Sequence, residues 1–302
     1  MIDVIIVNYN CSTYLQTLLE ILTKTDVDSP SRRVLLKITV VDNNSSDGSA
    51  DMVKTQFPGV QVIEREENDG YSAAVNEGLA STEEREILLL NSDIEISPDI
   101  IAQIRRIWDR LDFPGIIAPL HFEEDDFPQL TWGDHPTPTA EAKRRKLDMA
   151  AADREPWAKQ ELLAQSCKTR TVDWVSGSCM FFTRSTAMDI GPWDQNFFLF
   201  FEDIDWCLRA KEKGFEIYHT SEAQIRHAHG VSVDQDPEMS EIEYRRSQCY
   251  FTQKHFGSFS LLKLRAYLTF KILGRWIIGG RSGFDRSTSW QIFRDVWGKM
   301  GA

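Results

Sequence analysis

The chain has 302 residues, 42% of them hydrophobic and 26% charged, a composition typical of an ordinary globular protein. Its formal net charge of −12 argues against a general nucleic-acid-binding protein. Its five cysteines are scattered and include no CxxC pair, which argues against a disulfide framework and against a zinc knuckle.

The first hundred residues alternate between predicted strands and predicted helices. Short aliphatic runs predict strands over residues 3–7, 34–41, 60–63 and 86–90. Helical spacing of apolar residues and small-residue composition predict helices over residues 13–22, 49–57 and 70–81. A further helix is expected after Ser97, which is suited to the N-cap and is followed by Pro98. This alternation predicts βαβ units, a mostly parallel sheet and an α/β fold.

Polar side chains follow three of these strands at the point where each strand ends. The clusters are residues 8–10, 42–47 and 91–93. Turns between strands and helices favour Asn, Asp and Ser for conformational reasons alone. Ligands of such sheets, however, bind beyond the carboxyl ends of the strands. Three clusters at one edge therefore indicate a binding site.

The remainder of the chain is less regular. Residues 120–170 lose periodicity and are rich in proline and charge, so we expect an irregular excursion over the site. Residues 215–233 predict short strands and a turn, and helices are expected from about Glu238 onward. The first residues lack a basic region and a long apolar segment, so we expect no signal peptide and a cytoplasmic location.

Acidic residues and histidines are the best candidates for chemistry. The chain has no GxGxxG after the first strand, no GxxxxGK[ST] and no GxSxG, which disfavours dinucleotide-binding, P-loop and serine-hydrolase functions. Carboxylates and neutral imidazoles together suit a divalent ion that also takes phosphate oxygens. The candidates lie at the end of a strand, at the start of a helix and after a short apolar segment: Asp93, then Glu202, Asp203 and Asp205, then His227 and His229.

An ordered set of segments resembles the family 2 glycosyltransferases, and most of all their rhamnosyltransferase-like branch, which includes galactofuranosyltransferase relatives. The segments are VIIVNYN, VVDNNSSDGS, NDGYSAAVNEG, LLLNSD, GSCMFFTRS, GPWDQNFFLFFEDIDWCLRAKEKG and HAHGVS, spread over residues 2–232. The resemblance implies a GT-A-like fold, a mostly parallel sheet flanked by helices, over residues 1–237. Residues 238–302 are then a helical C-terminal extension, and residues 120–170 lie on the acceptor side. It also implies dependence on Mg²⁺ or Mn²⁺ and inversion at the anomeric carbon.

The resemblance assigns a set of residues to the nucleotide-diphospho-sugar donor. Val7, Asn8 and Tyr9 match a loop that holds the base and ribose. Asp42 matches an acid that contacts a pyrimidine ring, and Asn68 and Gly70 match a loop that closes over the nucleotide.

The segment NSD matches the family's DxD position. The resemblance therefore implies that Asp93 binds the metal and that Asn91 or Ser92 contacts the sugar–ribose region. His227, in the pattern H-x-x-G-x-S, matches the metal-binding histidine. The first acid of DxD is Asn91 in this chain, which leaves one carboxylate fewer for the metal.

The ED motif follows an aromatic run. Asp203 matches the general base, and Glu202 is expected to bind the acceptor. Burial raises the pKa of a carboxylate, which suits a base that works near neutral pH. The alternative for Glu202 and Asp205 is that the helix dipole favours acids in a first turn without any catalytic role. Phe197, Phe198, Phe200 and Phe201 are expected to pack under the sheet and to shape the acceptor site, and Trp193 is expected to help wall the sugar pocket.

The C-terminal part carries the opposite charge to the rest of the chain. From Lys254 onward there are nine Lys or Arg and two Asp or Glu, a formal charge of +7, which leaves −19 on the preceding residues. Basic residues interrupt the apolar run over residues 260–281 too often for a transmembrane helix. One interpretation is a helix packed on the catalytic domain or on a second subunit. Its packed stripe would be Leu261, Leu264, Leu268 and Ile272.

The second interpretation, which we favour, is an interfacial helix on the inner face of an anionic cell membrane. Phe270 and Trp276 are suited to that interface. A glycosyltransferase of a lipid-linked glycan would meet its acceptor there. The chain would then be a peripheral membrane protein.

We expect transfer of L-rhamnose from dTDP-rhamnose to a hydroxyl of a bacterial surface glycan or of its lipid-linked precursor. A UDP-linked donor such as UDP-galactofuranose is the alternative. From another class, the chain would be a non-catalytic nucleotide-sugar-binding partner in a glycan-assembly complex, which Asn91 favours and which Asp203 and His227 oppose. A nucleotidyltransferase would have a Gly-rich basic loop after the first strand, and NYNCSTY is not such a loop.

Overall fold

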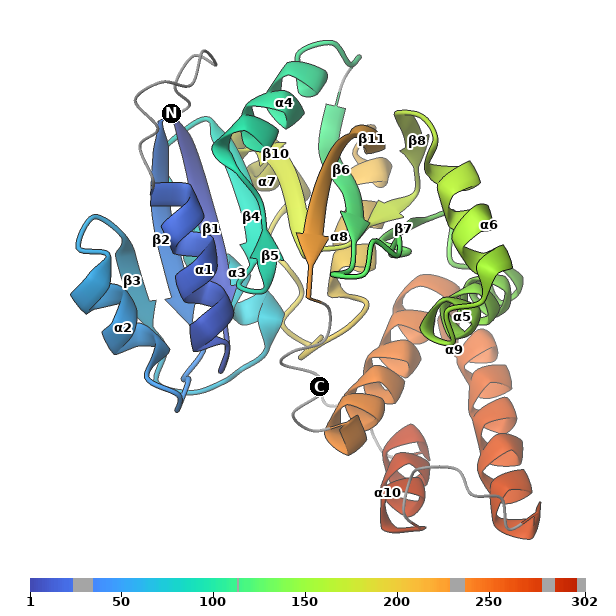
Figure 1. The fold of residues 1–302 in the computed structure, drawn as a ribbon. Coiled ribbons are helices and arrows are strands. Elements are labelled where there is room, and N and C mark those ends of the chain that lie inside the picture. The colour runs from blue at the N-terminus through green and yellow to red at the C-terminus, as the bar shows by residue number, and fades with distance from the viewer. Residues whose placement is uncertain (24–34, 113, 229–236, 279–285, 298–302) are drawn as a thin grey trace.

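The structure is a computed structural model that describes residues 1–23, 35–112, 114–228, 237–278 and 286–297 (Figure 1). A nine-stranded sheet lies at its centre, in the order β3-β2-β1-β4-β10-β6-β11-β5, with β8 paired to β11. Its strands are β1 (Ile2–Asn8), β2 (Leu36–Asp42), β3 (Gln61–Glu64), β4 (Glu86–Asn91), β5 (Ile94–Glu95), β6 (Pro114–Phe122), β8 (Arg170–Val172), β10 (Cys179–Thr183) and β11 (Glu216–His227). A small second sheet pairs β7 (Trp132–Gly133) with β9 (Trp174–Val175).

The sheet is mostly parallel, as predicted. Strands β1 to β4 run in the same direction, and β6 is parallel to β11. Strand β10 lies antiparallel between β4 and β6, which gives β6 and β11 the direction of β4. The predicted first, third and fourth strands are confirmed to within one residue at each end.

Helices cover both faces of the sheet (Figure 1). On one face α1 (Ser12–Thr23), α2 (Ser49–Gln56) and α4 (Pro98–Trp108) pack on Val4, Ile6 and Leu88. On the other face α3 (Tyr71–Ala80), α7 (Arg184–Ile190) and α8 (Glu202–Glu212) pack on Ile5 and Leu89. Alternate residues of one strand serve opposite faces, because side chains of a strand alternate between its two sides. The central strands are therefore apolar on both faces, as their continuous runs of Val, Ile and Leu require.

The helix predicted after Ser97 has the expected start. The Ser97 hydroxyl accepts a hydrogen bond from the backbone N–H of Ile100, and Pro98 occupies the first turn. The side chains of Ile101, Ile104 and Ile107 are buried. The cap satisfies an amide that the helix itself leaves unpaired.

Two predicted segments differ in the structure. Residues 120–170, predicted to be irregular, contain α5 (Pro138–Ala152) and α6 (Pro156–Ser166). These helices are rich in charged and small residues, so their sequences lack a strong apolar period. Residues 216–227 form one long strand with a register shift between Thr220 and Gln224 rather than several short ones. The strand stays continuous because β6 pairs with it on both sides of that irregularity.

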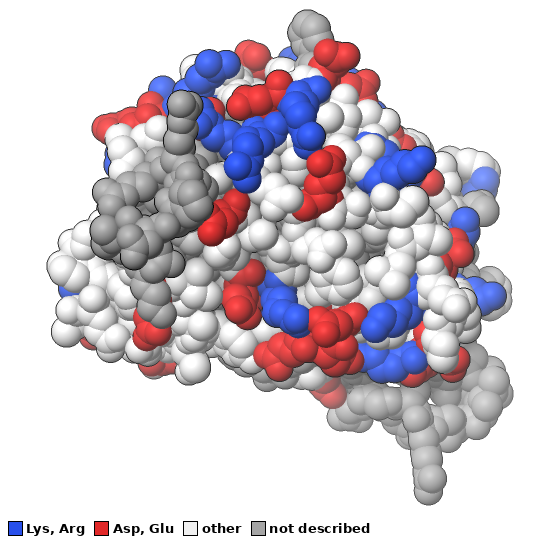
Figure 2. Space-filling view, turned by 45° about the horizontal axis from the view of Figure 1, so that its top comes forward, with Lys and Arg blue, Asp and Glu red and all other residues white. Residues whose placement is uncertain are grey.

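The C-terminal helices α9 (Pro237–Ile278) and α10 (Arg286–Trp297) lie beside the sheet domain (Figure 1). Gly257 has φ 77° and ψ 175°, so α9 is two helical segments joined at this residue. Only glycine adopts such a conformation readily. On the face in Figure 2, acidic and basic side chains are interspersed rather than gathered into a field of one sign.

Candidate active site

A cavity of about 910 Å³ opens at the carboxyl ends of β1 and β4. Strand pairing sets Asn8 opposite Asp42 and Val7 opposite Asn91, so the ends of three strands meet at this edge. The cavity wall includes most of the site residues predicted from the sequence. They are Val7, Tyr9, Asn68, Gly70, Asn91, Ser92, Asp93, Glu202, Asp203 and His227.

Asn8 and Asp42 lie behind this wall rather than in it. Both are buried, and Asn8 Nδ2 donates a hydrogen bond of 2.8 Å to Asp42 Oδ1. The second carboxylate oxygen accepts from the backbone N–H of Ser45 at 2.9 Å. In the structure this pair fixes the turn after β2, and the predicted contact of Asp42 with a pyrimidine remains a prediction.

The loop at Asn68 and Gly70 closes one side of the cavity. Asn43 Nδ2 donates to Asn68 Oδ1 at 2.7 Å, and the amide of Tyr71 donates to the carbonyl of Phe198 at 2.8 Å. Gly70 has φ +91°, and a Cβ atom there would lie 2.3 Å from the Phe198 carbonyl oxygen. Glycine is needed at this position because two backbones touch.

Asp93 and His227 face each other in the cavity wall. Asp93 Oδ1 lies 3.3 Å from His227 Nε2, and both side chains are at least 90% buried. Gln129 Nε2 donates to the His227 carbonyl, which leaves Gln129 Oε1 to accept from His227 Nδ1 at 2.9 Å. In a neutral imidazole, Nε2 is then the nitrogen with the lone pair, and it points toward a carboxylate oxygen. Two electron-rich atoms so placed suit a shared cation.

Asp203 and Glu202 begin α8 and line the cavity next to each other. Burial raises the pKa of Asp203, and hydrogen bonds from the amides of Gly177 and Ile204 only partly offset this. Burial, together with the neighbouring Asp203, raises the pKa of Glu202 further, and its Oε2 has no hydrogen-bond partner among the described residues. The larger rise at Glu202 favours ionisation of Asp203 before that of Glu202.

The aromatic run before these acids is bent. Phe200 and Phe201 have φ values of 68° and 67°, in a region that side-chain-bearing residues seldom occupy. Phe197 and Phe201 are buried in the core, while Phe198 and Phe200 line the cavity with Phe201. Strained backbone of this kind persists where the surrounding packing enforces it, and it sets the start of α8 against the cavity.

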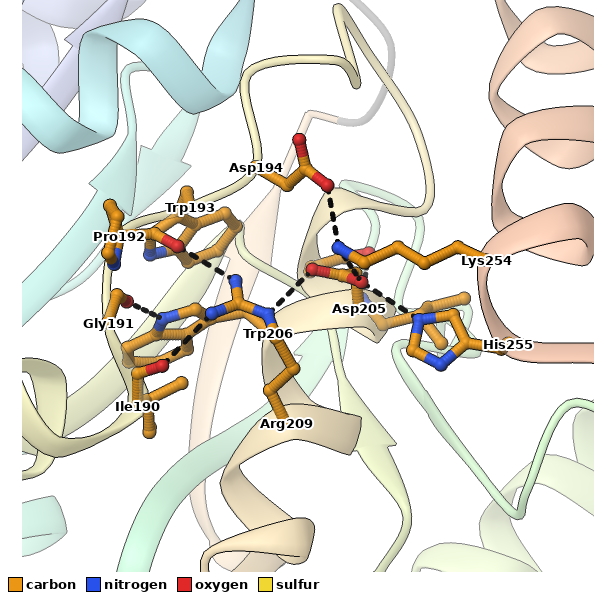
Figure 3. Close-up of polar contacts among 12 residues, drawn as sticks. Ile190, Gly191, Pro192, Trp193, Asp194, Asp205, Trp206, Arg209, Lys254 and His255 are labelled. Atoms are coloured by element: carbon orange, nitrogen blue, oxygen red, sulfur yellow. Dashed lines mark hydrogen bonds and ion pairs between the residues drawn. The ribbon is translucent and has the colours of Figure 1, made fainter.

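Asp205 does not reach the cavity but ties α8 to α9 (Figure 3). Its fully buried carboxylate accepts from Lys254 at 2.7 Å, His255 at 2.8 Å and Arg209 at 2.9 Å. Burial alone would raise the pKa of Asp205, but these partners outweigh it and lower the pKa. Lys254 also donates to Asp194 at 2.6 Å. Asp205 is thus an anchor between helices rather than a candidate for catalysis.

Two further side chains, Trp193 and His219, are buried away from the cavity. Trp193 is 1% exposed, stacks on Trp206 and does not line the cavity, contrary to the expectation from the sequence. Tyr71, whose ring contacts that of Trp193, lines the cavity instead. His219 is buried, stacks on Trp132 and has a pKa that burial lowers to about 3, in keeping with a structural role. His229, with Gly230 and Ser232 of the H-x-x-G-x-S pattern, lies outside the described residues.

Sequence reasoning missed part of the wall. Helix α5 contributes Arg144, Arg145 and Asp148, and the first segment of α9 contributes residues 239–241, 243 and 244. Arg144 is held between Glu141, at 2.9 Å, and Asp148, at 2.7 Å. The run KRRK in α5 was a signal of charge near the site, whereas nothing in the sequence of α9 marked its start as part of the wall.

Comparisons with known proteins find relatives in sequence and in fold. The family model described as "Glycosyl transferase family 2" matches residues 3–191. An N-acetylglucosaminyl-diphospho-decaprenol L-rhamnosyltransferase of Mycobacterium tuberculosis is 25% identical over 237 residues, 74% of this chain and 76% of that protein. The low-salt glycan biosynthesis hexosyltransferase Agl10 of Haloferax volcanii is 27% identical over 204 residues, 66% of this chain and 60% of that protein.

Solved structures share the fold at lower identity. A mannosyltransferase of Pyrobaculum calidifontis, in complex with GDP-Man and Mn²⁺, superposes with a TM-score of 0.57 at 16% identity, covering 85% of this chain and 64% of that one. Staphylococcus aureus TarS 1–349 gives 0.51 at 14% identity, covering 98% of this chain and 70% of that one. Because the family match spans more than half of the chain, the protein belongs to glycosyl transferase family 2 and is a glycosyltransferase of the GT-A fold with a rhamnosyltransferase-like sequence.

Proposed function

We propose that this glycosyltransferase moves L-rhamnose, with inversion, from dTDP-rhamnose to a hydroxyl of a lipid-linked bacterial glycan. The proposal rests on the presence, in one cavity, of a candidate general base and of a candidate metal-binding pair. A buried aspartate with a raised pKa, Asp203, and the pair Asp93 and His227 line the same cavity. The choice of sugar and acceptor follows the name of the mycobacterial relative.

Asp203 is the proposed general base. Its carboxylate is held by the amides of Gly177 and Ile204, which leaves further lone pairs for an acceptor hydroxyl. As that hydroxyl attacks the anomeric carbon from the side opposite the nucleotide, its proton passes to Asp203 and the C–O bond to the diphosphate breaks. One displacement inverts the anomeric carbon. When Glu202 is protonated, its carboxyl group is suited to donate a hydrogen bond to a second acceptor oxygen.

The donor set of Asp93 and His227 fits Mn²⁺ or Mg²⁺. No group of three His, Cys, Asp or Glu able to hold a metal occurs within the described residues. Asp93 and His227 offer a carboxylate and an imidazole, and phosphate oxygens and water are suited to other positions around the ion. When bound, the ion neutralises charge on the departing diphosphate. Gln129 holds the His227 ring in the tautomer that this role requires.

Unpaired acceptors at this edge of the sheet support a nucleotide at this end of the site. Asn8 Oδ1, Asn43 Oδ1 and Asn91 Oδ1 are buried and have no hydrogen-bond partner among the residues described. A buried acceptor without a partner costs free energy that a ligand N–H or O–H can recover after small side-chain shifts. The proposed nucleotide site therefore extends from β1 to β4.

A thermal-shift panel tests the proposal. With Mn²⁺ present, dTDP-rhamnose should raise the midpoint of unfolding more than UDP-galactofuranose, UDP-glucose or GDP-mannose, because a ligand selective for the folded state stabilises it. A larger shift with a UDP-linked sugar would identify that sugar, and not dTDP-rhamnose, as the donor. A shift from nucleotide sugars with no transfer to any lipid-linked acceptor would favour a non-catalytic binding partner.

A further inference from the structure

The second segment of α9, which begins after Gly257, has two unlike faces. One face packs through Leu261, Leu268 and Ile272, which are 2–8% exposed, against Ile292 of α10. Leu264 is partly buried against the same cluster. The stripe predicted for a packed helix is therefore present, and it holds α9 against α10.

The opposite face is apolar and exposed. Phe259 is 69% exposed and Phe270 is 75% exposed. They are eleven residues apart, about three helical turns, and so lie on the same side of the helix, about half a turn away from Leu261 and Leu268. Leu262 and Tyr267 flank them and are 53% and 60% exposed. Such a set of large apolar side chains in one segment indicates an interaction surface.

This face carries positive charge and no negative charge. Between Lys254 and Asp285 the sequence has no Asp or Glu, while Lys263 and Lys271 are in the described helix. Lys263 Nζ lies 4.3 Å from the centre of the Phe259 ring. Aromatic rings beside lysines on an amphipathic helix are typical of segments that lie in the interface of an anionic bilayer.

We propose that this face, defined by Phe259, Leu262, Lys263, Tyr267, Phe270 and Lys271, docks on an anionic lipid surface. No helix within the described residues is long and apolar enough to cross a bilayer, so contact would be from one side. A second copy of the chain fits the face less well, because two faces of like charge would oppose each other. The first segment of the same helix lines the cavity, so docking would hold the cavity close to lipid-linked molecules.

This inference does not depend on the proposed reaction, because it is tested without donor or acceptor. Full-length protein is floated with vesicles of phosphatidylglycerol and phosphatidylcholine at low salt. The protein should float with phosphatidylglycerol and less with phosphatidylcholine, and high salt should weaken the binding because it screens the lysines. Lys263→Glu with Lys271→Glu should reduce binding about tenfold or more, since each basic residue near an anionic surface contributes about 1 kcal/mol.

Phe259→Ser with Phe270→Ser tests the apolar contribution and should reduce binding at both low and high salt. Met188→Ser is the matched control, because Met188 is 71% exposed and lies on α7. Equal thermal midpoints of the three proteins establish that the helix stays folded. Wild-type protein that fails to float with phosphatidylglycerol, or a double Phe variant that floats like the wild type, would overturn the proposal. A dimer in solution that the double Phe variant makes monomeric would assign the face to a second copy instead.

Discussion

The ammonium of Lys254 lies 2.7 Å from the carboxylate of Asp205, two residues beyond the proposed base Asp203. This ion pair joins α9 to the start of α8 behind the cavity (Figure 3). The position of Asp203 therefore depends on a helix that follows it by some fifty residues. The first segment of α9, which the sequence assigned to a helical C-terminal extension over residues 238–302, lines the candidate site.

We expect Asp205→Asn to destabilise the protein by about 3 kcal/mol or more. The substitution removes the charge that three cationic or polar partners share in a buried site, and breaking such a cluster leaves buried charge unpaired. Denaturant unfolding with Asp189→Asn as an exposed control measures the effect. Equal stability of the two variants would show that the Asp205 cluster does not anchor α9.

The rate of transfer should rise with pH through the raised pKa of Asp203. Below that pKa the carboxyl is protonated and cannot accept a proton, so the acid limb of kcat should lie above the range of an ordinary aspartate. Burial raises the pKa of Asp203, and the positive charge of Arg144 offsets part of that rise. Arg144→Gln should therefore move the acid limb to higher pH. A limb that stays in place in this variant would contradict the assignment.

Gly70→Ala should weaken donor binding at least tenfold. The new Cβ would meet the backbone of Phe198, and φ +91° is unfavourable for alanine, so the loop must move away from the cavity. Gly59→Ala is the control, because nothing lies within 4 Å of its Cβ position. Titration calorimetry with the nucleoside diphosphate and Mn²⁺ compares the two. Unchanged affinity in Gly70→Ala would separate this loop from the nucleotide site.

Chelation of divalent ions should abolish transfer, and Mn²⁺ or Mg²⁺ should restore it. Asp93→Asn and His227→Gln should each weaken Mn²⁺ binding in the presence of nucleoside diphosphate, since each removes a ligand. Paramagnetic broadening of nucleotide NMR signals by Mn²⁺ reports this binding apart from turnover. Full activity in EDTA would refute the metal-dependent reaction, and unchanged Mn²⁺ binding in both variants would refute the site.

The sequence predicted the sheet because its signals are local. Runs such as residues 87–90 are apolar on both faces of β4, and the polar residues that follow them mark the end of each strand. Ten predicted site residues line one cavity. Most of them follow strands, and parallel strands bring their carboxyl ends to one edge, whereas Glu202 and Asp203 come from the start of α8.

The parts of the cavity wall that the sequence did not predict depend on contacts between residues far apart in the chain. Helices α5 and α9 reach the cavity through contacts such as Tyr244 with Glu141, at 2.9 Å across a hundred residues of sequence, and no local pattern encodes such a contact. Asp203 and Asp205 are both acids in the first turn of α8, yet their partners differ. The carboxylate of Asp203 accepts from backbone amides, and that of Asp205 contacts basic side chains. Their separate surroundings, and not their sequence, distinguish an anchor from a candidate base.

The central claim is that Asp203 accepts the proton of an acceptor hydroxyl. The most direct measurement is acceptor-dependent release of dTDP from saturating dTDP-rhamnose and Mn²⁺, compared between the wild type and Asp203→Asn. The account predicts that the variant binds the donor with nearly unchanged affinity, while its kcat falls by about a hundredfold or more. A folded Asp203→Asn protein that releases dTDP at close to the wild-type rate would contradict the account.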